Sequence, residues 1–233
     1  MSQPLIELKN VSKKYGFKEG LRNINLSLSK GGIIGLVGTN GSGKSTLLKL
    51  LAGFVQPSKG SVLISGQKAN RRRGDIVAFQ SDKEALYPFY TVEETLRFSD
   101  KVFPSFDLKK AYELISHFHL DLKQPVKNLS KGYLARLKMA VTLARKLPLT
   151  LMDEPLSGID PIARGEMIQN IASHIDLEQQ TLLLSTHEVD EIEHLLDHVI
   201  LLHEGKVVYS ENVELLRESR NVSVLEIMKE VAK

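Results

Sequence analysis

Apolar and polar positions alternate in the first part of the chain, as they do in strands that bury one face. Short, wholly apolar runs lie among these alternating segments and read as strands buried on both faces. The two patterns predict strands at residues 6–11, 24–28, 33–37, 62–64 and 76–79. After the third of these strands, four leucines and Phe54 recur at helical spacing, which predicts a helix.

The pattern changes between about residue 81 and residue 146, where helical periodicity replaces the strand patterns. Thr91 and Glu94 have the three-residue spacing of a capping box, which predicts the start of a helix. The segments 108–120 and 130–147 predict two more helices. We call residues 81–146 the helical block.

Strands and helices alternate again after the helical block. The pattern predicts strands at 147–152, 181–185 and 199–202 and helices at 161–173 and 188–196, with a last helix in the tail at 222–232. Such alternation favours an α/β core with a largely parallel sheet. We expect a single domain over 1–233, made of a core (about 1–80 and 147–215), the helical block and a tail (about 216–233).

Composition and charge exclude several classes of protein. A chain of 233 residues, 42% hydrophobic and 25% charged, has ordinary globular composition and enough length for a full core. No apolar run approaches the roughly 18 residues that span a bilayer, and we expect no signal peptide. The absence of cysteine excludes disulfides and thiol catalysis. A net charge of +3 is too small to predict binding to nucleic acid, so no such partner is expected.

The most specific motif lies between the strand 33–37 and the following helix. Residues 38–46 fit the pattern Gly-x-x-x-x-Gly-Lys-Ser/Thr in the strand–loop–helix context that it requires, and we call them the phosphate loop. Lys44 would reach the outer phosphates and Ser45 would bind Mg²⁺, while backbone N–H groups and the helix N-terminus favour an anion. The alternative is a Gly/Ser loop without a ligand. The candidate nucleotide-binding residues are Gly38, Thr39, Asn40, Gly41, Ser42, Gly43, Lys44, Ser45 and Thr46.

Two adjacent acids follow the strand predicted at 147–152. A carboxylate at the C-terminal end of a buried strand would lie beside the phosphate loop, so Asp153 is the candidate Mg²⁺ partner. Glu154 points elsewhere and is a candidate for polarising a water molecule against the terminal phosphate. Taken alone, the two acids would fit a plain turn equally well.

Three further segments, with Gln80, complete a recognisable order along the chain. They are Leu129-Ser130-Lys131-Gly132-Tyr133 (the signature segment), Ser157-Gly158-Ile159-Asp160-Pro161 and Ser185-Thr186-His187-Glu188. In order and spacing, the phosphate loop and these segments resemble the ATP-binding-cassette (ABC) family over roughly residues 6–209. The resemblance implies a P-loop NTPase core with an N-terminal antiparallel β portion and a helical subdomain that carries the signature.

The resemblance also implies a role for particular residues. Tyr15 matches the aromatic residue that stacks on adenine, against the alternative of an ordinary loop tyrosine. Gln80 matches the glutamine that senses the γ-phosphate and Mg²⁺. Ser130 and Gly132 match the residues that close on the ATP of a second subunit, Asp160 belongs to the segment that crosses between subunits, and His187 matches the histidine that contacts the γ-phosphate and organises Glu154.

ATP and Mg²⁺ are the cofactors implied by the resemblance, and ATP hydrolysis coupled to transport is the implied activity. The implied partners are a second ATP-binding subunit, identical or different, and an integral-membrane transporter subunit. The implied location is the cytoplasm, peripheral on the inner face of the cell membrane.

The family signature commonly reads Leu-Ser-Gly-Gly-Gln, and Lys131 and Tyr133 depart from it. Such variants resemble small bacterial ABC-2-type and bacitracin-export-type ATPases, which implies an exporter.

Two other interpretations of the whole chain stay open at this point. One is a non-transport ABC ATPase that acts on DNA or on the ribosome. DNA-repair members carry a long coiled-coil insertion before the signature, and no heptad run occurs there in this chain; translation-type members usually carry two cassettes. The other is a binding module without turnover, and the presence of both Glu154 and His187 argues against it.

Two local patterns also have two interpretations. The aromatic segment, Tyr87-Pro88-Phe89-Tyr90, is either local core or part of the groove that receives a short helix of the membrane subunit in the family. His194 and His198 have a spacing able to bind a metal, but no third ligand is apparent, so a polar surface is favoured.

Overall fold

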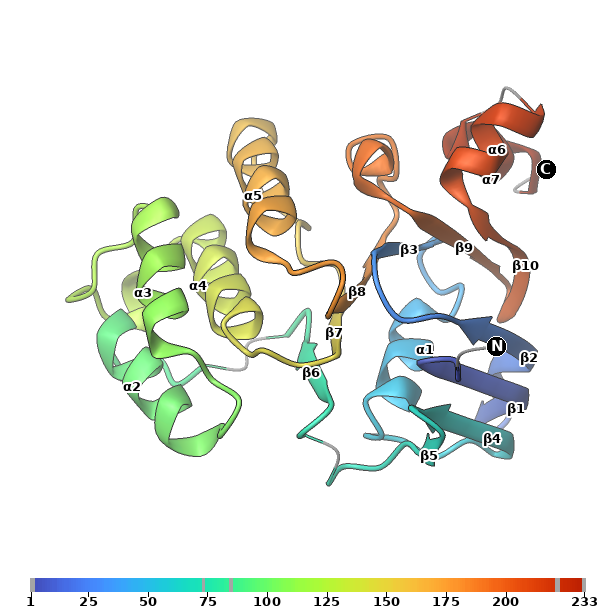
Figure 1. Ribbon diagram of the computed structural model, residues 1–233, viewed down its shortest axis with the longest axis horizontal. Coiled ribbons are helices and arrows are strands. Elements are labelled where there is room, and N and C mark those ends of the chain that lie inside the picture. The colour runs from blue at the N-terminus through green and yellow to red at the C-terminus, as the bar shows by residue number, and fades with distance from the viewer. Residues whose placement is uncertain (1–2, 73, 84–85, 221–222, 232–233) are drawn as a thin grey trace.

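The computed structural model describes residues 3–72, 74–83, 86–220 and 223–231. The chain forms a four-stranded antiparallel sheet and a six-stranded, mostly parallel sheet (Figure 1). The antiparallel sheet has the order β2-β1-β4-β5, with β1 (Ile6–Tyr15), β2 (Lys18–Leu28), β4 (Lys59–Ile64) and β5 (Gln67–Lys68). This confirms the expected antiparallel N-terminal portion.

The larger sheet has the order β10-β9-β3-β8-β7-β6. Its strands are β3 (Ile33–Val37), β6 (Val77–Gln80), β7 (Leu149–Met152), β8 (Thr181–Thr186), β9 (His198–His203) and β10 (Lys206–Asn212). All neighbouring pairs are parallel except β10 with β9. The α/β class with a largely parallel sheet is therefore confirmed.

Helix α1 (Lys44–Leu51) lies between the two sheets. Its four leucines are fully buried among residues of β1, β2 and β4 on one side and of the parallel sheet on the other. Each fully buried leucine contributes about 1.5–3 kcal/mol relative to an exposed one. A helix packed in this way holds its N-terminus, and with it the phosphate loop, in a fixed position.

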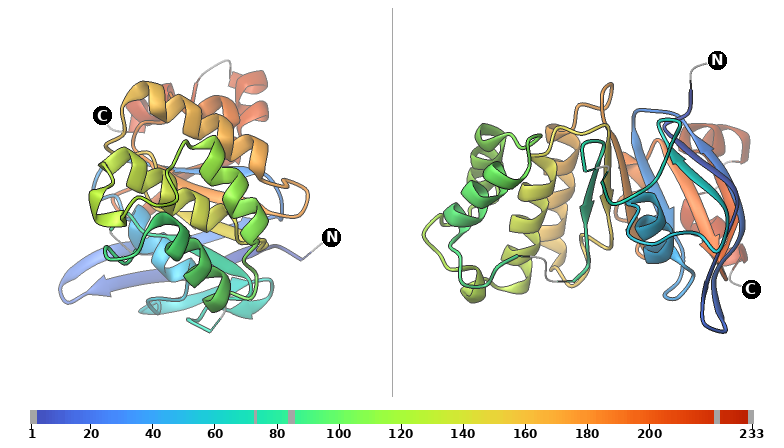
Figure 2. Two further views of the ribbon diagram at one scale, coloured as in Figure 1. Left: turned by 90° about the vertical axis from the view of Figure 1, so that its left-hand side faces the viewer. Right: turned by 90° about the horizontal axis from the view of Figure 1, so that it is seen from below.

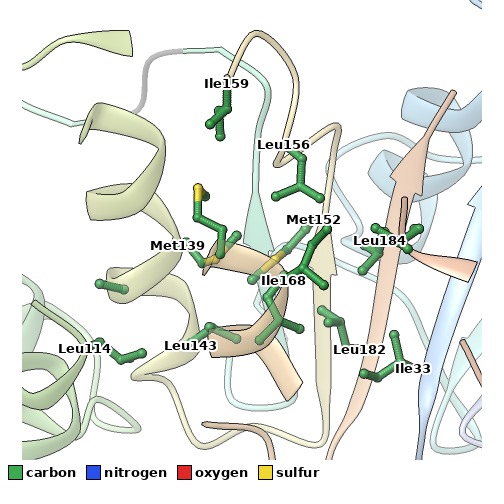
Figure 3. Close-up of a cluster of buried hydrophobic side chains, with 14 of the residues drawn as sticks. Ile33, Leu114, Met139, Leu143, Met152, Leu156, Ile159, Ile168, Leu182 and Leu184 are labelled. Atoms are coloured by element: carbon green, nitrogen blue, oxygen red, sulfur yellow. The ribbon is translucent and has the colours of Figure 1, made fainter. Parts of the chain in front are cut away.

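Helices α4 (Lys131–Leu143) and α5 (Pro161–His174) cover the other face of the parallel sheet, and the other helices of the helical block pack on α4 (Figure 1). The block contains α2 (Val92–Val102), α3 (Leu108–His117), a 3₁₀ turn (Val126–Asn128) and α4 (Lys131–Leu143). Figure 3 shows Met139 and Leu143 of α4 gathered with Met152 of β7 and Ile168 of α5. Figure 2 shows that α2 and α3 lie at the end of the molecule opposite the antiparallel sheet.

Alternation along the parallel strands assigns residues to the two cores. In β8, Leu182 and Leu184 join the core under α4 and α5, whereas Leu183 joins the core around α1. Successive side chains on a strand point to opposite faces, so an unbroken apolar strand is the expected sequence for a sheet covered on both sides.

Several expected boundaries are confirmed and others are wrong. The capping box is present, because Thr91 Oγ1 accepts from the Glu94 amide and the Glu94 carboxylate accepts from the Thr91 amide. Helix α3 ends before residue 120, where His119 has φ +53°, and α4 ends before residue 147. The tail forms α6 (Val213–Arg220) and α7 (Val224–Val231), and residues 222 and 232 of the expected helix lie outside the described residues. None of the helices in the described ranges is long and apolar enough to cross a membrane.

The helix expected at 188–196 is absent, and this segment contains only a 3₁₀ turn, η2 (Glu193–Leu195). Val189, Ile192 and Leu196 are buried at spacings that mimic a helix. Separate turns bury these three side chains in place of a helix, because the chain must become extended at once to form β9. Asp197 already exchanges hydrogen bonds with Ile33, which starts the pairing of β9 beside β3.

Candidate functional site

The phosphate loop connects β3 to α1, and its glycines allow the backbone to turn closely. Gly43 has φ +114°, and a Cβ there would lie 2.7 Å from the carbonyl oxygen of Gly20. None of the described side chains caps the N-terminus of α1. The N–H groups of that first turn therefore face the loop, in the arrangement that binds phosphate.

Lys44 is folded back into the loop. Its ammonium group donates to the carbonyl oxygens of Gly38 at 2.7 Å and Thr39 at 3.3 Å and lies 3.1 Å from Glu154 Oε1. The side chain is almost fully buried. The ammonium group therefore lies inside the phosphate loop, with a carboxylate beside it.

Asp153 is fully buried at the end of β7, next to the phosphate loop. Its Oδ1 accepts from Ser45 Oγ at 3.0 Å and from Ser185 Oγ at 2.9 Å. Burial raises the pKa of the Asp153 carboxyl, and the hydrogen bonds from the two serines lower it in part. Its second oxygen, Oδ2, is buried without a hydrogen-bond partner in the described part of the chain.

Gln80 lies at the end of the neighbouring strand, β6. It pairs with Met152 in the sheet register, and its backbone oxygen accepts from the Asp153 amide at 2.9 Å. Gln80 Oε1 is also buried without a partner among the described residues. The unpartnered oxygens of Asp153 and Gln80, together with the Ser45 hydroxyl that contacts Asp153, are donors of the kind that Mg²⁺ prefers, so these residues fit the metal.

Glu154 connects Lys44 to His187. Its second oxygen, Oε2, lies 2.9 Å from His187 Nδ1, and its amide donates to Ser185 Oγ at 3.0 Å. Glu154 has φ +48°, a left-handed conformation that is uncommon for residues other than glycine and costs on the order of 1–3 kcal/mol. The fold maintains this conformation at the point where the two acids must point in different directions.

A cleft of about 380 Å³ opens beside the phosphate loop. It is lined by Tyr15, Lys18, Glu19, Gly20, Asn40, Gly41, Gly43, Lys44, Ser45, Thr46, Asp82 and Glu154. The Tyr15 ring is 47% exposed, and Lys13 Nζ lies 5.0 Å from its centre. The structure therefore brings the predicted aromatic residue and the predicted carboxylate together around the predicted loop.

The signature residues do not line this cleft. Ser130 caps α4 by accepting from the Tyr133 amide at 3.3 Å, and Gly132 lies in the first turn of that helix. Lys131 and Tyr133 are exposed there. Asp160 likewise caps another helix, α5, by accepting from the Ala163 amide. In one copy of the chain, these residues and the phosphate loop belong to separate surfaces.

Ser185 was not among the residues predicted for the site, although its hydroxyl contacts both acids. It lies two residues before His187, at the end of β8, and this same-face spacing is the signal that would have identified it. Asp82, which lines the cleft, was missed as well.

The aromatic segment borders a groove of about 240 Å³ that begins at Gln80. The groove is lined by residues of β6, α2 and α4 and by Tyr87, Tyr90 and Phe98, whose rings contact one another. Tyr87 is 48% and Phe89 68% exposed. The segment thus presents aromatic surface to solvent at the boundary between the core and the helical block.

The two candidate metal-binding histidines lie on different elements. His194 is in η2, and His198 begins β9 with its Nε2 2.9 Å from Ser210 Oγ. Burial lowers the pKa of His198. No group of three or more potential metal-binding side chains of this type occurs within the described residues.

Comparison with known proteins points to one family. The family model described as ABC transporter matches residues 21–157. The chain is 30% identical to the lantibiotic transport ATP-binding protein SrtF of Streptococcus pyogenes, over 91% of this chain and 95% of that protein. It is 32% identical to the aliphatic sulfonates import ATP-binding protein SsuB of Zymomonas mobilis, over 93% and 90% of the two chains.

Solved structures agree with this result. A structure described as the ATP-binding subunit of an ABC transporter superposes with a TM-score of 0.87 at 26% identity and covers 98% of this chain and 100% of that one. The dimeric ATP-binding cassette MJ0796, bound to ADP and phosphate after hydrolysis, superposes with a TM-score of 0.78 at 25% identity over 89% and 98% of the two chains. The fold, the built phosphate site and both sets of relatives lead to one conclusion: the chain belongs to the ABC family, as an ATP-hydrolysing ATP-binding subunit of a transporter.

Proposed function

We propose that two copies of this chain, or this chain and a related one, enclose ATP between them and drive an exporter through a separate membrane subunit. The observation that carries the proposal is the division of the site. The phosphate loop, Glu154 and Tyr15 line one cleft, whereas Ser130 and Gly132 lie outside it, at the start of α4. A second subunit can bring its own signature segment to the cleft, so each nucleotide would contact both subunits in the closed pair. Closure would then follow ATP binding, because ATP stabilises the closed pair more than the open one.

Within one site, we assign Mg²⁺ to Ser45, Gln80 and Asp153. The bound metal would neutralise charge on the phosphate oxygens. The phosphate loop would hold the phosphates through its backbone N–H groups and Lys44, and Tyr15 would stack on adenine. When the phosphates bind Lys44, its contact with Glu154 weakens, and Glu154 would accept a proton from the attacking water while His187 orients it.

The aromatic groove beside Gln80 is our candidate contact for the membrane subunit. It places exposed rings at the strand end that carries Gln80, so a change at the nucleotide would reach the contact over a short path. Tyr, Trp and Phe side chains are enriched in such interfaces. This contact would hold the subunit on the inner face of the cell membrane.

Export is the direction that we propose. The family resemblance of the signature variant supports it, and SrtF, a relative named for lantibiotic transport, is compatible with it. SsuB, which is named for import, has a similar identity, so transport assays in vesicles are needed to decide the direction.

A purification experiment tests for the membrane partner. The tagged chain, purified from detergent-solubilised membranes, should carry a polytopic membrane protein. Association with ribosomes or DNA instead would favour the non-transport alternative.

A complementation assay tests the shared site. Lys44→Ala disables the phosphate loop but keeps the signature, and Gly132→Asp adds a side chain and a negative charge to the signature but keeps the phosphate loop. Each variant alone should lack ATPase activity, and mixing the two should restore part of it, because a mixed dimer contains one intact site. Recovery would show sites shared between copies of this chain. No recovery would contradict a homodimer and leave pairing with a related chain, to be tested by co-expression with that chain.

A further inference from the structure

A largely buried arginine of α5 joins two segments near the proposed hydrolysis site. Arg164 lies in the first turn of α5, and its side chain is 11% exposed. Its Nη1 donates to the carboxylates of both Glu188 and Glu191. Its Nη2 donates to the Ile159 carbonyl oxygen at 2.9 Å. A planar guanidinium held by three acceptors fixes the direction of each contact as well as its charge.

The first of these segments is the loop after β8, which begins at His187. It lacks the regular helix that its apolar spacing predicts, so no continuous ladder of backbone hydrogen bonds stiffens it. Val189 and Ile192 anchor it to the core. Glu188 and Glu191, in contrast, are 44% and 32% exposed and are tied down by Arg164. Because Glu188 directly follows His187, the position of the histidine depends on this tie.

The second segment, residues 157–160, precedes α5. Gly158 has φ +73° and no atom within 4 Å of its virtual Cβ, so the chain faces open space at that residue, whereas Ile159 is buried in the core. A small cavity lies between Ser157, at the start of this segment, and Thr186 and Glu188 at the start of the loop after β8. Since the two segments are not closely packed at that point, Arg164 provides a direct polar connection between them.

We propose that Arg164 is a positioning residue that holds His187 in line with Glu154 and makes its position depend on the segment 157–160. This inference rests on the proposed role of His187. A shift of Ile159 would pull the guanidinium, and the guanidinium would pull Glu188. Arg164 touches neither acid of the hydrolysis site, so its effect on turnover must pass through His187.

A double-mutant cycle on the full-length subunit tests this route. Arg164→Gln should lower kcat about 10- to 100-fold, because a misplacement of about 1 Å near the reacting groups costs up to about 100-fold. The KM for ATP should change by less than about three-fold, since the phosphate loop is untouched. In a His187→Ala background, measured by release of radiolabelled phosphate, the same change should have an effect of less than about two-fold. Arg164→Lys, which keeps the charge without the planar fork, should recover part of the lost activity.

Arg136 provides the matched control. It is also a buried arginine, bound to the Phe118 carbonyl oxygen at 3.1 Å and to Glu166 at 2.8 Å, but it does not contact the loop after β8. Arg136→Gln should lower the melting temperature about as much as Arg164→Gln and should keep kcat. Equal losses of kcat in the two variants, or an Arg164→Gln effect that is the same with and without His187, would overturn the proposal. If His187→Ala left turnover unchanged, that result would contradict the role of His187 in the proposed function. The comparison of Arg164→Gln with Arg136→Gln tests the role of Arg164 independently of that result.

Discussion

The hydroxyl of Ser185 lies between the two acids of the site. It donates to Asp153 Oδ1 and accepts from the Glu154 amide, so one side chain sets the position of the proposed metal ligand and of the proposed base. At the scale of single residues, the sequence predicted the residues of the phosphate loop because the spacing of that motif is specific. Ser185 has no comparable motif, and its role depends on the sheet register that brings β8 beside β7.

The buried carboxyl of Asp153 gives a prediction about pH and stability. A raised pKa means that folding favours the protonated form, so stability is lost as the pH rises from the ordinary aspartate value, about 3.9, through the raised value. Without nucleotide, Asp153→Asn should therefore raise the melting temperature at pH 7 by a few degrees, at about 2–4 °C for each kcal/mol in a chain of this size. The gain should shrink as the pH is lowered toward 4.

Thermal melts of the Asp153→Asn variant and the wild type at several pH values, with and without Mg²⁺ and ATP, would check this. Mg²⁺ with ATP should stabilise the wild type more than the variant, because the variant lacks the anionic oxygen. Asp190→Asn, an exposed change in the loop after β8, serves as the control and should show no such trend. A variant less stable than the wild type at pH 7 would contradict the cost that we assign to the buried charge.

At the scale of elements, most strands were predicted where they occur, but β1 and β2 are longer than expected and several helix ends differ. The run 33–37 and the Thr91 capping box are local signals, and the structure confirms both. The helix expected at 188–196 failed because its apolar spacing is real but serves isolated turns before β9. The strands β5 and β10 were not predicted: β5 has only two residues, and the apolar residues of β10 are confined to its first half.

The aromatic segment gives a prediction at this scale. Phe89 is 68% exposed, so Phe89→Ala should change the free energy of unfolding of the isolated subunit by less than about 0.5 kcal/mol. Phe118→Ala, which empties a fully buried site, should cost about 3–5 kcal/mol. Urea unfolding followed by circular dichroism would measure both. If the aromatic segment is part of the docking contact, Phe89→Ala should also reduce recovery of the membrane subunit. A large loss of stability without the partner would instead assign the segment to the core.

At the scale of the whole molecule, the divided site predicts a dimer that can be trapped. Glu154→Gln keeps the shape of the side chain and removes the charge, so ATP binding should survive while hydrolysis falls about 10²- to 10⁴-fold. With ATP and Mg²⁺, this variant should elute as a dimer in size-exclusion chromatography, and adding Lys44→Ala should return it to a monomer. Turnover at the wild-type rate would exclude Glu154 as the base.

The division into core, helical block and tail stays a prediction that limited proteolysis can examine.

Helix α1 has a mechanical consequence. It is enclosed by two sheets, and its leucines are fully buried, so the end of the molecule that receives the phosphates is stiff. The helical block joins the rest of the chain through the segments near Gln80 and Pro148, and it packs mainly on one face of the parallel sheet. A body that is attached through two chain segments can rotate more easily than a helix that is enclosed by two sheets. We therefore expect the displacement caused by nucleotide to appear as rotation of α2–α4 relative to α1, with little distortion around α1 itself.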